Sequence, residues 1–123
     1  MKLLIIHGNK KSNLPSGETI SIEHDRKVLE DFATVHLEIF EGPNFSPIKA
    51  PIWFFCLFWS KRNYDWTLAI IREFKPDVVH FHNIGPQLSL SPLFAAKKFN
   101  LPTIQTLHNV KWVCVDGAFF RHT

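Results

Sequence analysis

The sequence predicts a single α/β domain, in which a parallel sheet carries helices on both faces. The chain has 123 residues, the size of one domain. Hydrophobic residues make up 46% and charged residues 20%, which is enough for a packed core and too apolar for disorder. Short apolar runs also alternate with helical patterns along the chain. This alternation is typical of parallel strands joined by right-handed crossovers.

The first half of the chain predicts a strand, a helix and a second strand. Residues 3–6 are apolar without interruption, as in a buried parallel strand, and His7 should follow the strand's end. A polar loop over residues 9–17 leads to a helix over residues 18–32. Residues 35–40 alternate between apolar and polar side chains, which predicts the second strand. The helix should bury four apolar side chains: Ile22, Val28, Leu29 and Phe32.

The second half predicts two more helices and two more strands. Residues 63–74 carry an apolar stripe and form a helix that Pro76 ends, because the residue before a proline avoids the α region. Residues 78–82 form the third strand and residues 103–107 the fourth. Between them, Ser91 is expected as the N-cap and Pro92 as the first residue of a helix that ends near residue 99.

The long segment between residues 40 and 77 suggests that the chain crosses back over the first strand. The sheet would then have its topological switch point between the first and third strands. Ligands in open parallel sheets bind at the carboxyl ends of the strands beside such a point.

Histidines mark this edge of the predicted sheet. His7 follows the first strand, His82 ends the third and His108 follows the fourth, so the three imidazoles are expected to converge. Ser16, Gly17 and Glu18 open the first helix, where free backbone N–H groups favour phosphate or carboxylate. The sequence therefore predicts a ligand site at this edge.

Purely structural roles would account for some of the same residues. Ser16 and Gly17 are common in an ordinary helix cap, and Asn83 and Asn109 suit turns after strands. His80 lies inside the third strand and is expected to be a buried, hydrogen-bonded side chain. His80 and His82 have the spacing of some metal ligands, but no carboxylate cluster accompanies them, so we expect no metal.

Charge and cysteine usage exclude several function classes. The net charge is +3 and the pI about 9.0, but the basic pairs are scattered, so we expect no nucleic-acid partner. Cys56 and Cys114 form no CxxC motif, which excludes a zinc knuckle or a disulfide framework. The first apolar run is too short for a signal peptide, and a cytoplasmic protein is expected.

Several motifs together resemble the N-terminal, Rossmann-like domain of family 4 glycosyltransferases, the retaining enzymes with two such domains. The motifs are MKLLIIH at the start, SGE at the first helix, REFKPDVVHFHN, LFAAKKFNLP, TIQTLHN and CVDGAFFR, and they cover nearly the whole chain. KPDVVHFHN and PTIQTLHN at this separation are the most specific combination.

The resemblance implies transfer of a sugar from a nucleotide-sugar, the co-substrate, to a hydroxyl of a sugar or lipid-linked acceptor, with no bound cofactor. It implies that His108 lies over the transferred sugar and is catalytic. It places Ser16, Gly17 and Glu18 near the donor phosphates, although the family has a glycine where Ser16 stands. The acceptor side would include His82 and Asn83, with Asn109 beside His108.

Family members also need a second domain that holds the nucleotide-sugar. We therefore expect residues 1–123 to be the C-terminally incomplete, acceptor-side part of such an enzyme, inactive alone, and to require a donor-binding domain or subunit.

The segment IWFFCLFW, residues 52–59, holds much of an aromatic content of 14%. Its rings could pack beneath the sheet. Alternatively, with Lys61 and Arg62 beside them, they could make the chain a non-enzymatic interaction module that contacts a membrane surface or a partner subunit. We expect some rings here and at Phe119 and Phe120 to be exposed.

Overall fold

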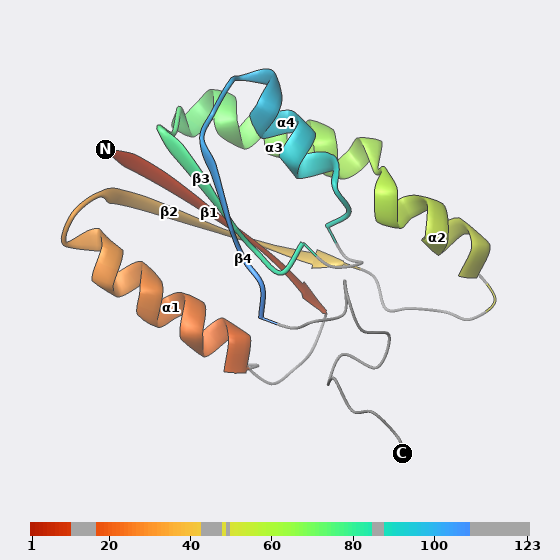
Figure 1. Cartoon of the computed structure of the whole chain (residues 1–123), viewed down its shortest axis with the longest axis horizontal. Helices are drawn as coiled ribbons and strands as arrows, with labels where there is room; N and C mark the ends of the chain where they lie inside the picture. The colour runs from red at the N-terminus through yellow and green to blue at the C-terminus, as the bar shows by residue number, and fades with distance from the viewer. Residues whose placement is uncertain (11–16, 43–47, 49, 85–87, 109–123) are drawn as a thin grey trace, which may run out of the picture.

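The computed structural model describes residues 1–10, 17–42, 48, 50–84 and 88–108. Within these residues, four strands and four helices follow one another in the order β, α, β, α, α, β, α, β (Figure 1). Their bounds are β1 (Lys2–Lys10), α1 (Gly17–Glu30), β2 (Thr34–Gly42), α2 (Ala50–Phe58), α3 (Lys61–Phe74), β3 (Val78–His82), α4 (Ser91–Lys98) and β4 (Thr103–Thr106).

The four strands form one parallel sheet in the order β2-β1-β3-β4. The chain leaves β1 to one side to form β2 and then returns past β1 to form β3. The predicted switch point between the first and third strands is therefore confirmed, and the sheet is Rossmann-like, with helices on both faces (Figure 1).

Alternating side chains of the buried strands form two cores. Leu4, Ile6, Val79 and Phe81 face α3 and α4, and they belong to the larger core. Leu3 and Ile5 point to the opposite face and pack against Ile22 of α1. Because β1 and β3 are covered on both sides, their sequences are apolar almost without interruption.

Local signals explain where α3 begins and ends. The Ser60 side chain accepts a hydrogen bond from the Asn63 backbone N–H, which caps the helix. Lys75 adopts a left-handed conformation after the last turn, and its N–H donates to the Ile71 carbonyl. Pro76 then prevents the helix from continuing.

The predicted N-cap of α4 is wrong by one residue. Leu90 occupies the N-cap and Ser91 is the first residue of the helix, with Pro92 after it. The Ser91 hydroxyl instead accepts from the Ser60 N–H at 2.6 Å, which joins the start of α4 to the start of α3. The Ser89 hydroxyl accepts from the Ser91 N–H at 3.3 Å.

β2 and α3 are each two residues longer at one end than predicted, and larger differences occur in β1 and α1. β1 continues past His7 to Lys10, because β2 runs beside it as far as Gly42 and supplies hydrogen-bond partners. α1 ends at Glu30, so Phe32 lies in the turn beyond it and is 78% exposed. Val28 is 48% exposed, since it lies one position away from the stripe that faces the sheet. Ile22 and Leu29 do pack against the sheet, as predicted.

Gly8 lies where β1 passes close to the segment that follows β3. A Cβ atom at Gly8 would be 2.9 Å from Cγ and Cδ1 of Leu88 and 3.3 Å from the Asn83 carbonyl oxygen. Leu88 is fully buried, so it has little room to move. We expect Gly8→Ala to lower the free energy of unfolding by about 1–3 kcal/mol.

Urea denaturation followed by far-UV circular dichroism measures this change. Gly17→Ala is the matched control, because nothing lies within 4 Å of a Cβ atom at Gly17. Equal unfolding midpoints for the two variants would show that the chain accommodates a methyl group at Gly8.

Candidate functional site

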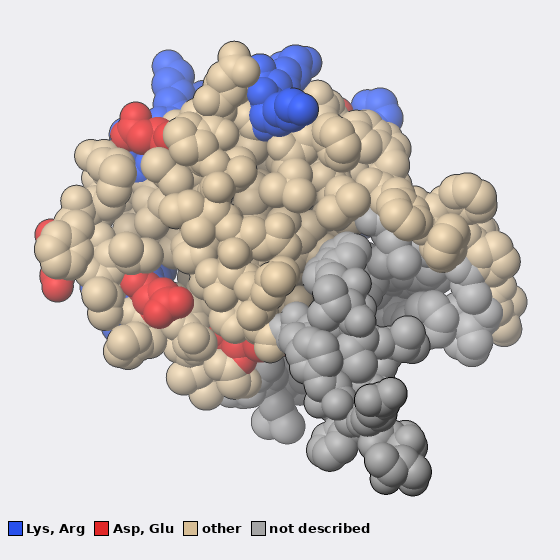
Figure 2. Space-filling view, in the orientation of Figure 1, with Lys and Arg blue, Asp and Glu red and all other residues tan. Residues whose placement is uncertain are grey.

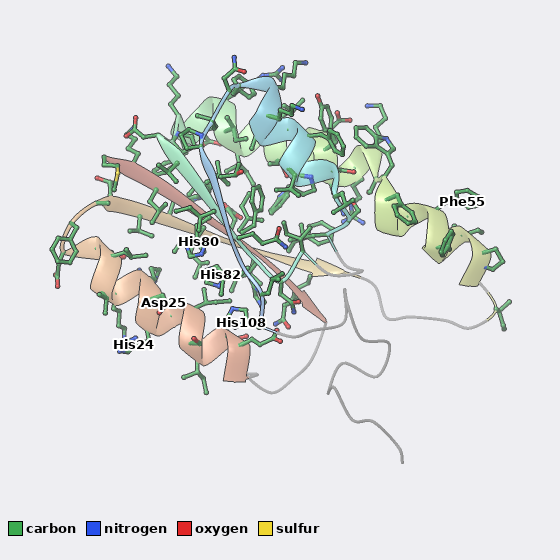
Figure 3. The ribbon with its side chains drawn as sticks, viewed as in Figure 1. His24, Asp25, Phe55, His80, His82 and His108 are labelled. Carbon is green, nitrogen blue, oxygen red and sulfur yellow. The ribbon has the colours of Figure 1, made fainter. Side chains whose placement is uncertain are left out.

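The candidate site lies at the carboxyl edge of β1, β3 and β4, beside the start of α1. His7 and His82 are direct register partners on β1 and β3, and Thr106 pairs with His82 from β4. Figure 3 shows His80, His82 and His108 in a row on the α1 side of the sheet. The parallel arrangement thus brings together residues that are far apart in the sequence.

His82 and His108 form the centre of the site. Nδ1 of His82 lies 2.9 Å from Nε2 of His108, so one ring donates a hydrogen bond to the other. His82 is fully buried, whereas His108 is partly exposed. His108 is therefore the member of the pair that a ligand can reach. The buried His82 ring orients the His108 ring through their hydrogen bond.

His7 supports this pair from the neighbouring strand. Its Nδ1 lies 3.3 Å from the carbonyl oxygen of His82. A carbonyl can only accept, so Nδ1 of His7 carries the hydrogen and Nε2 is left as an acceptor. Within the described residues, the buried Nε2 atoms of His7 and His82 have no hydrogen-bond partner.

His80 has a hydrogen-bond partner, as expected, but it is half-buried where a buried side chain was predicted. Its Nε2 lies 2.8 Å from the hydroxyl of Thr106 on β4. The ring centroids of His80 and His82 are 4.1 Å apart, since both side chains point to the same face of β3. Thr106 is a residue of this edge that the sequence patterns did not predict. The signal that could have found it is its position two residues before His108.

The helix end and the strand end meet through Glu18 and Asn83. The Asn83 side-chain amide donates to the Glu18 carboxylate at 2.8 Å, across 65 residues of sequence. Asn83 has φ of 51°, a left-handed conformation that asparagine tolerates and that turns the chain away from β3. Glu18 lies in the first turn of α1, where the helix dipole favours a negative charge. Gly17 is exposed at the same helix end.

Burial favours the neutral form of His7, His80 and His82. It lowers the pKa of His82 to about 4, with smaller contributions from His80, His108 and His7 in the same direction. Burial also lowers the pKa of His7, against the opposing effect of its hydrogen bond to the His82 carbonyl. The pKa of His80 is lowered for the same reason, although Asp25 opposes the shift. Each ring thus offers one N–H and one lone pair near neutral pH.

The structure brings together His82, His108, Glu18 and Asn83 from the predicted site, and it leaves Gly17 exposed beside them. Ser16 and Asn109 lie outside the described residues. Among the residues that are described, no three His, Cys, Asp or Glu side chains are arranged to hold a metal ion. A shallow, open groove of about 370 Å³ between α1 and β2 is lined by His36 but by none of the four histidines of the candidate site, His7, His80, His82 and His108.

Comparisons with known proteins support the fold. No protein-family model matches the sequence, and no curated protein matches it either. Among solved structures, the chain is similar to UDP-GlcNAc 2-epimerase from Methanocaldococcus jannaschii, with a TM-score of 0.53 and 19% sequence identity. The likeness covers 86% of this chain and 31% of that enzyme, so the chain spans about a third of the enzyme's length. At this identity the likeness shows a shared Rossmann-like fold.

Proposed function

We propose that this chain is the acceptor-side part of a glycosyltransferase similar to those of family 4. In this proposal a nucleotide-sugar donates its sugar to a hydroxyl group of a sugar or lipid-linked acceptor. The observation that carries the proposal is the convergence of His108, Glu18 and Asn83 at the carboxyl edge beside the switch point. Ligands bind at this place in open parallel sheets.

The chemistry of the site suits a sugar. Hydroxyl groups both donate and accept hydrogen bonds, so they match an imidazole, a carboxamide and a carboxylate. His108 offers a nitrogen on a partly exposed ring, and Glu18 and Asn83 are also partly exposed. The buried position of His82 favours a role in orienting His108 through their hydrogen bond over direct contact with the ligand.

The role we assign to His108 is catalytic. An imidazole held in one orientation can donate a hydrogen bond to an oxygen that becomes more negative as the sugar leaves its phosphate. The backbone N–H groups at Gly17 and the start of α1 can favour the departing phosphate in the same way.

The nucleotide is assigned to a second domain or subunit. Residues 1–123 by themselves are then expected to transfer no sugar. The fold similarity to a sugar-nucleotide epimerase, over about a third of that enzyme, is compatible with this division.

Ligand titrations of the isolated chain test the proposal. Free sugars and sugar phosphates are expected to bind at the histidine edge at millimolar concentration, and UDP, as a representative nucleotide, is expected to bind far more weakly. Titrations followed through the histidine ring signals measure both, and tighter binding of UDP would contradict the proposal.

A further inference from the structure

We propose that α2 docks the protein onto an anionic lipid bilayer surface. α2 is an apolar helix whose described side chains contribute to neither hydrophobic core. Figure 1 shows it extending from the start of α3, away from the sheet. This inference is independent of the proposed transferase activity, because it involves a different surface.

The exposed rings of α2 are the first argument. Its nine residues, APIWFFCLF, contain no charged side chain. Ile52 is 64% exposed, Phe54 59%, Phe55 74% and Phe58 51%. Successive side chains are about 100° apart around a helix axis. Viewed down the axis of α2, its described exposed side chains span an arc of about 200°, with Phe54 at one edge and Cys56 at the other. A helix that packs on one protein face typically has a narrower apolar stripe, near 100°.

The length of α2 limits how it can meet a membrane. Nine residues of helix extend over about 14 Å, less than half the thickness of a bilayer's hydrocarbon core. No helix within the described ranges is long and apolar enough to cross a membrane. α2 can therefore enter one leaflet only, at the boundary between headgroups and acyl chains.

The residues that follow α2 suit the headgroup region. Trp59 is 48% exposed and packs edge-on against Phe94 of α4, so it fixes the junction between α2 and the body of the protein. Tryptophan is enriched at the level of lipid headgroups. Lys61 and Arg62 come next and are exposed, and Lys61 also pairs with Asp65. Basic residues in this position attract anionic headgroups.

The charges of the four described helices would orient the molecule in the same way. α2, α3 and α4 together carry five basic and two acidic residues, whereas α1 carries two basic and four acidic residues. In Figure 2 the charged atoms over α3 and α4 are mostly blue, and the visible part of α2 carries no charge. Among the described helices, those on the side that bears α2 are thus the positive ones, which is why we assign an anionic lipid surface as the occupant of α2.

Vesicle flotation tests the proposal on residues 1–123. The probes are vesicles of phosphatidylcholine alone and vesicles that also contain phosphatidylglycerol. We expect the protein to float with the anionic vesicles, and to do so less at raised salt or on neutral vesicles. Phe55→Asp should lower the partition coefficient about tenfold or more, because it removes one large ring from the buried surface. Phe32→Asp is the matched control, since Phe32 is similarly exposed but follows α1 on the acidic side.

A second measurement uses the protein without a change in its aromatic surface. A nitroxide attached to the exposed Cys56, in a chain with Cys114→Ser, reports depth in the bilayer. Adding anionic vesicles should raise its collisions with oxygen and lower those with a water-soluble nickel reagent.

Three results would overturn the proposal. One is flotation that Phe55→Asp and Phe32→Asp affect equally. Another is binding that does not depend on lipid charge. The third is a dimer in sedimentation experiments that Phe55→Asp dissociates, with no change in the nitroxide signal on adding vesicles, because α2 would then cover a second copy of the chain.

Discussion

Acidification from about pH 7 to about pH 4.5 is expected to lower the free energy of unfolding by roughly 2–3 kcal/mol through His82 alone. Burial lowers the pKa of His82 from 6.5 to about 4 in the folded protein. In the unfolded chain the imidazole is solvated and binds a proton near pH 6.5. The unfolded state therefore binds more protons between these two values, and stability is lost as the pH falls through this range.

Urea denaturation at a series of pH values measures this effect. His82→Gln removes the titrating group. The free energy of unfolding should then vary less with pH above about pH 4.5, whatever the effect of the substitution on stability at pH 7. His24→Gln is the control, because the His24 side chain is 76% exposed on α1. An unchanged slope for His82→Gln would mean that His82 is not buried as a neutral ring.

The largest effect on activity is expected at His108. In a preparation that joins this chain to the donor-binding domain that we propose, His108→Ala should lower the rate of the proposed sugar transfer by about 100- to 1,000-fold. The reason is the loss of a hydrogen-bond donor at the reacting oxygen. The His82–His108 hydrogen bond, 2.9 Å long, holds that donor in one orientation.

Initial rates with saturating donor and acceptor, together with circular dichroism of each variant, separate catalysis from folding. His24→Ala is the matched control, since it removes an exposed imidazole away from the edge. The chain without a donor-binding domain should show no turnover. A His108→Ala enzyme that transfers sugar at the rate of the parent would remove His108 from the reacting centre.

The strand order and the histidine cluster could be predicted because both follow from the pattern of apolar runs along the chain. Two short apolar runs with a long crossing segment between them place β1 and β3 side by side. Once these strands are parallel neighbours, side chains at paired positions lie side by side, as His7 within β1 and His82 at the end of β3 do. The contact between Glu18 and Asn83 follows from the same topology, because α1 begins at that edge.

The predicted and observed ends of helices and strands differ because of long-range contacts, which local sequence patterns do not predict. β1 extends to Lys10 only because β2 is present beside it. The Ser91 hydroxyl bonds to the Ser60 backbone across 31 residues, and sequence spacing gives no sign of that contact. Val28 was expected to be buried but is exposed, because a weakly amphipathic sequence does not fix the rotation of α1 about its axis to within one residue position.

The segment of residues 52–59 shows a further limit of sequence patterns. A short, continuously apolar run fits a buried strand or a buried helix equally well. In the structure it forms most of α2, and packing beneath the sheet is wrong for its described rings, because Phe54, Phe55 and Phe58 are each more than half exposed. The expected exposure of this cluster is confirmed for these rings, whereas Phe119 and Phe120 lie outside the described residues.

The most direct test of an acceptor site at the histidine edge is ligand binding followed by nuclear magnetic resonance of the histidine rings. Chain labelled with ¹⁵N at histidine is titrated with N-acetylglucosamine, its 1-phosphate and UDP. We predict that the sugar and its phosphate shift the ring signals of His108 and His82 and leave those of His24 and His36 unchanged, with little response to UDP alone. Sugars that leave the His108 signal unchanged at millimolar concentration, or UDP that shifts it more strongly than they do, would contradict an acceptor site at this edge.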